Sequence, residues 1–87
     1  MQDKATPRWP RDQRALGAAV RETRARRGLS QERLAALAGT HRNYVGQLER
    51  GEVSPTFRTL LRVAGGMRIA LSELVAIYER NAGEPTA

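Results

Sequence analysis

The 87-residue chain has no cysteine, which excludes disulfide bridges and thiolate sites for zinc or iron–sulfur clusters. With a single histidine, His41, an imidazole metal cluster is not expected, and the sequence calls for no cofactor. No apolar run approaches the roughly 18 residues of a membrane span, and the first residues lack the apolar stretch of a signal peptide. Catalytic constellations are lacking too, so the sequence predicts a cytoplasmic, non-enzymatic single domain with no small-molecule ligand.

Acidic residues are the minority, nine against 15 basic ones, and the net charge is +6. Fourteen of the basic residues are arginine, whose planar guanidinium binds phosphates and guanine edges through paired hydrogen bonds. This favours a polyanionic partner, although an arginine-biased soluble protein has the same composition. Residues 1–27 carry +5 of the excess, residues 28–50 carry +1 and residues 51–87 carry none.

The spacing of apolar residues predicts five short helices, an all-α bundle without strands. They are expected at about 11–27, 31–38, 41–50, 57 to Gly65–Gly66 and 71–80, within a domain spanning 11–80. A flexible basic arm at 1–10 and a flexible tail at 81–87 complete the chain. The expected inward stripes are Leu16, Ala19, Val20 and Thr23; Leu34, Ala35, Leu37 and Ala38; Val45 and Leu48; Phe57, Leu60, Leu61 and Ala64; and Leu71, Leu74, Val75 and Tyr78.

Capping residues separate these helices. Gly28, Gly39 and Gly51 are placed to end the first three helices, and Ser30 and Thr56 to begin the second and fourth. Residues 28–52 therefore hold two short helices joined by a glycine-containing turn, the pattern of a helix-turn-helix. In that motif the second helix occupies the DNA major groove.

The outward face of this second helix suits base recognition. Val45 and Leu48 mark its inward side. Rotation by about 100° per residue then places Asn43, Gln47 and Arg50 on the side of the helix opposite Val45 and Leu48. Gly46 lies beside these three residues, and Arg42 lies near the boundary of the face at the N-terminal end. Arginine pairs with guanine, and asparagine and glutamine pair with adenine. A merely solvated face more often mixes glutamate and lysine.

Residues 16–75 resemble the phage-repressor-type (Xre/Cro-like) helix-turn-helix family. The family motif is present as GLSQERLAALAGTHRNYVGQLERGEVSPTFRTLL, and its HRNYVGQLERG stretch is most similar to controller proteins of restriction–modification systems. The resemblance implies a five-helix, lambda-repressor-like bundle that binds a palindromic double-stranded DNA operator as a homodimer and regulates transcription. It also implies a bacterial or phage source and association with the nucleoid.

The resemblance places base contacts at Arg42, Asn43 and Gln47, in agreement with the rotation. It gives Tyr44 a contact with the DNA backbone or a thymine methyl, with half-buried packing as the alternative.

Phosphate contacts are implied at Gln31, Thr56 and Arg58. Gln31 also braces the recognition helix in the family, or else serves only as the first residue of its helix. Arg58 alternatively is a solvated charge, and Arg50 either touches phosphate or holds the following loop. Arg24 and Glu49 match a structural ion pair that fixes helix register.

The chain departs from the family at several positions. His41 stands where the family has a serine or threonine cap, so Thr40 is expected to cap instead and shift the helix start. Gly46 lowers the stability of the recognition helix relative to alanine. It either lets the helix backbone approach DNA closely or is simply a weak point. The resemblance extends the fourth helix to Met67, beyond the end at Gly65–Gly66 that local signals predict. It places Arg68 at the family's left-handed glycine and Ala70 at its capping serine, so the junction before the last helix should be soft. That helix often forms the family's dimer interface.

Other functions remain open. An antitoxin uses the same domain to bind its operator and a toxin protein, and an interaction module keeps the fold without DNA binding. Arg8, Arg11 and Arg14 either form an arm on the DNA backbone or minor groove, or belong to a solubilising tail.

Overall fold

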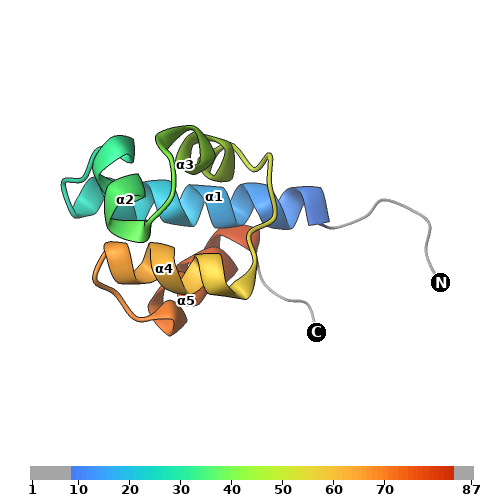
Figure 1. Ribbon diagram of the computed structural model, residues 1–87. Helices are drawn as coiled ribbons and strands as arrows, with labels where there is room; N and C mark the ends of the chain where they lie inside the picture. The colour runs from blue at the N-terminus through green and yellow to red at the C-terminus, as the bar shows by residue number, and fades with distance from the viewer. Residues whose placement is uncertain (1–8, 84–87) are drawn as a thin grey trace.

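Five α-helices and no strands make up residues 9–83, the part of the chain that the computed structural model describes (Figure 1). They are α1 (Trp9–Arg26), α2 (Gln31–Ala38), α3 (Arg42–Glu49), α4 (Phe57–Gly66) and α5 (Leu71–Ala82). The predicted all-α class is confirmed. Within the described range, no helix combines the length and apolarity that a membrane crossing requires.

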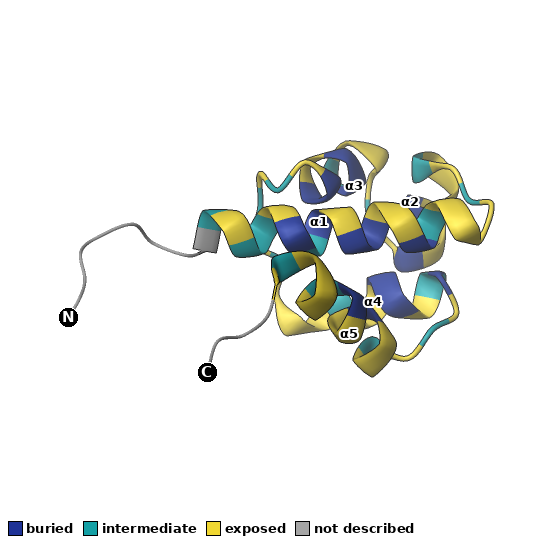
Figure 2. Ribbon diagram, turned by 180° about the vertical axis from the view of Figure 1, so that it is seen from behind, coloured by how far each residue is buried: buried dark blue, intermediate teal, exposed yellow. Residues whose placement is uncertain are grey.

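The long helix α1 runs through the middle of the molecule. It packs against α3 and α5, while α2 packs against α3 and α4. Both views show α3 on one side of α1 and α4 and α5 on the other (Figures 1 and 2). The core between them is formed by buried residues of all five helices, among them Val20, Leu34, Leu48, Met67 and Leu74. This arrangement leaves α3 at the edge of the bundle, with one face uncovered.

The predicted caps are present at the helix ends. Ser30 accepts a hydrogen bond from the Arg33 backbone N–H at 2.9 Å, and Thr56 caps α4 in the same way through Thr59. Arg68 has a left-handed φ of 60°, which confirms that a non-glycine residue occupies this strained position. Ala70 is the N-cap residue of α5 and makes no side-chain cap bond. The junction between α4 and α5 is therefore under-capped, as predicted.

A close approach of α1 to α3 depends on Gly17. A Cβ on Gly17 would stand 2.6 Å from the Glu49 carbonyl oxygen and closer still to that of Leu48. Because both obstacles are backbone atoms, no side-chain rotation relieves them. Gly17 thus sets how near the C-terminal end of α3 lies to α1, a role that helical periodicity does not reveal.

Four residues of the expected inward stripes are exposed: Leu37 (46%), Phe57 (67%), Leu61 (47%) and Val75 (36%). The prediction was wrong for them because a helix buries a stripe of limited width, and neighbouring apolar positions compete for it. In α4 the inward side is taken by Val63, Ala64 and the following Met67, so the stripe is rotated away from Phe57 and Leu61.

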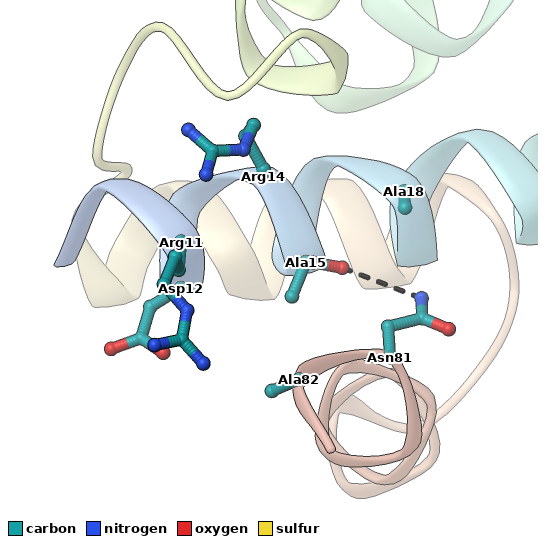
Figure 3. A pocket seen from close by; sticks show the side chains of 7 residues that line it. All are labelled: Arg11, Asp12, Arg14, Ala15, Ala18, Asn81 and Ala82. Carbon is teal, nitrogen blue, oxygen red and sulfur yellow. Dashed lines mark hydrogen bonds between the residues drawn. The ribbon is translucent and has the colours of Figure 1, made fainter. Parts of the chain in front are cut away.

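The expected arm and tail are partly helical. Arg11 and Arg14 lie in α1, which begins at Trp9, so these two arginines do not belong to an arm. Arg8 lies outside the described residues. At the other end, Asn81 lies in α5 and donates a hydrogen bond to the Ala15 carbonyl at 3.4 Å (Figure 3). This bond ties the end of α5 to the first half of α1.

Candidate nucleic-acid interface

The exposed face of α3 carries Arg42, Asn43 and Gln47, which we call the recognition face. Val45 and Leu48 are fully buried on the opposite side and hold the helix against the core. The helix is eight residues long and is uncovered at the edge of the bundle (Figure 1). The recognition face therefore combines one guanidinium with two amides, groups that can pair with base edges in a major groove about 12 Å wide.

The carboxylate of Glu49 fixes the position of α3. It accepts hydrogen bonds from Arg24 Nε at 2.6 Å and Nη2 at 3.0 Å, and from Gln31 Nε2 at 2.9 Å. The Glu49 side chain has no exposed surface. Hydrogen bonding to this carboxylate raises the pKa of the Arg24 guanidinium, and the attraction between the two charges adds to that rise, while burial opposes it. One buried group thus joins α1, α2 and α3.

Gln31 occupies the position expected for a brace. Its amide nitrogen is used by Glu49, so the bracing contact exists in the structure. The phosphate contact at Gln31 stays a prediction. Gln31 is half-buried at the first residue of α2, where free backbone N–H groups favour an anion.

Both arginines near the ends of α3 are paired with carboxylates. Arg42 Nη1 lies 3.1 Å from Glu32 Oε2, and Arg50 donates to Glu52 through Nε at 2.8 Å and Nη2 at 3.2 Å. Hydrogen bonding to Arg50 lowers the pKa of the Glu52 carboxyl. Of the two roles left open for Arg50, this pair supports holding the loop after α3. Periodicity alone could not identify either partner, because Glu32 belongs to another helix and Glu52 to a loop.

Gly46 is buried, and its missing side chain leaves space for Arg50. A Cβ at this position would stand 3.1 Å from Arg50 Nη1 and 3.8 Å from Gln31 Oε1. The structure therefore gives Gly46 an intramolecular role: it permits the Arg50 guanidinium to lie across the helix. Close approach of the backbone to DNA at Gly46 stays a prediction.

Tyr44 is half-buried and packs against the core, and its contact with DNA stays a prediction. Burial raises the pKa of its phenol. Tyr44 and Thr56 share a hollow with Arg62. The Thr56 hydroxyl is occupied at the start of α4, where it accepts from Thr59 N–H and donates to Thr59 Oγ1, both at 3.1 Å. Arg62 is an exposed cation beside this hollow that the sequence did not single out.

The start of α3 differs from the expectation. The helix begins at Arg42 with His41 as its N-cap residue, and His41 makes no side-chain cap bond. Thr40 does not cap α3, because the N-cap position is occupied by His41, and the Thr40 backbone N–H belongs to the end of α2 through a 2.9 Å bond to the Ala35 carbonyl. The helix start is consequently not shifted.

Arg58 is exposed in the first turn of α4. It lies two residues after the capping Thr56, at the N-terminal end of the helix, where the macrodipole favours an anion. Its phosphate contact stays a prediction.

Comparison with known proteins finds similarity over most of the described bundle. The helix-turn-helix family model (HTH_3) matches residues 20–74. The HTH-type transcriptional regulator SutR of Escherichia coli K12 is 36% identical over 63 residues, which are 72% of this chain but 35% of SutR. The control protein C.SmaI of Serratia marcescens is 39% identical over 56 residues, 64% of this chain and 67% of C.SmaI.

A solved structure gives the same result in three dimensions. The restriction-modification controller protein C.AhdI from Aeromonas hydrophila has a TM-score of 0.75 and 38% sequence identity. The alignment covers 79% of this chain and 99% of C.AhdI. The chain thus spans about a third of SutR but nearly all of C.AhdI.

Proposed function

Because the chain belongs to the helix-turn-helix family of DNA-binding transcriptional regulators, we propose that it regulates transcription by binding a specific double-stranded DNA operator through α3. The observation that carries this proposal is the uncovered recognition face of Arg42, Asn43 and Gln47 on a helix anchored by Val45 and Leu48. The two amides suit adenine and the guanidinium suits guanine.

Phosphate contacts on either side of α3 would position it in the groove. Gln31 begins α2 and is bonded to the end of α3, whereas Thr56 begins α4 and shares a hollow with Tyr44 of α3. Two helix N-termini, each with a positive dipole end, are therefore neighbours of the recognition helix. Arg58 and Arg62 add exposed cations along α4. Binding should weaken steeply with salt, because phosphate contacts release counterions.

The operator is proposed to be palindromic and the protein to bind it as a homodimer. Two copies would place their α3 helices in successive major grooves, about 34–36 Å apart. Support comes from the similarity to controller proteins and from exposed apolar side chains on α4 and α5, Leu61 and Val75.

Selection from a random double-stranded DNA pool tests this proposal. The wild-type protein should enrich two inverted half-sites whose centres lie one helical turn apart. The double variant Asn43→Ala/Gln47→Ala should lose that enrichment, while Arg80→Ala, on α5, should keep it. A single enriched half-site would contradict the dimer, and no enrichment would contradict the function. Co-purification of a second, toxic protein would instead point to an antitoxin.

A further inference from the structure

The two arginines at the ends of α3 are both paired with glutamates, whereas Arg33 is exposed on α2. Residues 28–52 contain three arginines and three glutamates. Glu49 is buried with Arg24, and the other two glutamates each hold an arginine: Glu32 holds Arg42, and Glu52 holds Arg50. The net charge of +6 therefore lies mostly elsewhere, with the first 27 residues carrying +5.

The pair between Glu32 and Arg42 can open readily. The two side chains are 69% and 66% exposed and are joined by one hydrogen bond of 3.1 Å. Exposed pairs of this kind contribute little to stability and are screened by salt. By contrast, Glu52 holds Arg50 through two hydrogen bonds. Arg42 is thus the guanidinium of this surface that is easier to exchange between a carboxylate and a new partner.

We propose that Glu32 is a specificity-determining residue that keeps Arg42 from binding phosphate and yields it to guanine. This inference rests on the proposed function. Every DNA sequence offers phosphates, so a free Arg42 would strengthen binding to any sequence. Guanine offers O6 and N7 together to one guanidinium, a pairing of fixed geometry inside the groove. Glu32 competes with phosphate for Arg42 more effectively than it competes with guanine. It therefore raises the ratio of specific to non-specific affinity.

The position of Glu32 adds a second effect. Once Arg42 leaves, the Glu32 carboxylate stands without that partner on the DNA-binding side, where phosphate charge repels it. A complex on the wrong sequence bears this repulsion without a guanine contact to offset it. The carboxylate therefore penalises non-specific complexes more than the operator complex.

The test is Glu32→Gln, measured by fluorescence anisotropy on the selected operator and on a scrambled duplex at several salt concentrations. Affinity for the scrambled duplex should rise about 3- to 10-fold, and its salt dependence should steepen by about one phosphate contact. Affinity for the operator should rise less than that. Glu79→Gln is the matched control, because it removes the same charge from an exposed residue of α5.

A double-mutant cycle shows whether Glu32 acts through Arg42. In an Arg42→Ala background, Glu32→Gln should leave the ratio of operator affinity to scrambled-duplex affinity unchanged, because relief of phosphate repulsion then acts alike on both duplexes. Three results would overturn the proposal: equal effects of Glu32→Gln and Glu79→Gln, a specificity ratio that Glu32→Gln leaves unchanged in the wild-type background, or a change of that ratio that persists without Arg42. A wild-type protein that selects an operator but shows one of these results refutes the role of Glu32 alone. A wild-type protein that selects no sequence refutes the proposed function and this inference together.

Discussion

The Arg24 guanidinium donates to both carboxylate oxygens of Glu49, through Nε at 2.6 Å and Nη2 at 3.0 Å, and so joins α1 to the last residue of α3. Arg24 Nη1 also donates to the Leu29 carbonyl at 2.8 Å, which ties in the turn before α2. A buried pair of this kind fixes geometry more than it stabilises, since removing two charges from water is costly. We infer that this ion pair fixes how far the recognition face of α3 projects from α1.

Removing one partner of this pair should be severe. Arg24→Ala leaves the wholly buried Glu49 carboxylate with one hydrogen bond, from Gln31, and a longer 3.8 Å contact with the exposed Arg21. It should lower the free energy of unfolding by about 3–5 kcal/mol. Glu49→Gln keeps the shape without the charge and should cost less. Urea denaturation measures both. Arg80→Ala, which breaks the exposed 4.0 Å contact with Glu22, should cost about 0–1 kcal/mol. Equal losses for Arg24→Ala and Arg80→Ala would refute the structural role.

The close approach at Gly17 gives a second prediction. Gly17→Ala forces a Cβ against the backbone of α3 and should lower the free energy of unfolding by about 1–3 kcal/mol or more. Gly65→Ala is the matched control, because it adds the same methyl group to α4 with no atom within 4 Å. It should stabilise by about 1 kcal/mol through helix propensity. A gain in melting temperature for Gly17→Ala would contradict the packing.

The junction between α4 and α5 should be easy to improve. Ala70→Ser supplies the missing cap of α5 and should stabilise by about 0.5–2 kcal/mol. Arg68→Gly relieves the left-handed φ of 60° and should raise the free energy of unfolding by roughly 1 kcal/mol. The greater conformational freedom of glycine in the unfolded chain offsets part of this gain. Thermal denaturation of the single and double variants checks this. A loss of stability for Ala70→Ser would show that the N-terminus of α5 has another partner.

These predictions show how far local signals reach. Ser30 and Thr56 were assigned correctly because a cap is decided by the neighbouring few residues. The left-handed φ of Arg68 was expected from the family resemblance, whereas local signals indicated a helix end at Gly65–Gly66. The recognition face was predictable because Val45 and Leu48 orient α3 without ambiguity.

Features that depend on a distant element were not predictable. The crowding at Gly17 arises from a backbone about thirty residues further along the chain, and the pair of Glu32 with Arg42 joins two helices. Phe57 was misplaced because several apolar positions of α4 compete for one inward side. Thr40 was misassigned because α3 begins at Arg42, which puts His41 and not Thr40 at the N-cap position.

Gly46 allows the role of Arg50 to be separated from helix stability. Gly46→Ala should stabilise α3 by up to about 1 kcal/mol, since the obstacle is the end of a flexible and half-exposed side chain. The guanidinium of Arg50 must then move by a few tenths of an ångström, which disturbs its bonds to Glu52. Urea denaturation gives the first effect and NMR of the Arg50 Nε–H resonance gives the second. A lower stability of Gly46→Ala than of the wild-type protein would show that the Arg50 side chain cannot move aside.

The central claim is that α3 distinguishes base sequence through its recognition face, and Arg42→Ala tests it most directly. Affinities of the wild-type protein and the variant are compared on the selected operator, on operators altered at each base pair, and on a scrambled duplex. The variant should bind the operator about 5- to 150-fold more weakly, equivalent to about 1–3 kcal/mol, and should lose its preference at one guanine of each half-site. Its affinity for the scrambled duplex should change much less. An equal loss on operator and scrambled DNA, with every base preference intact, would contradict the account.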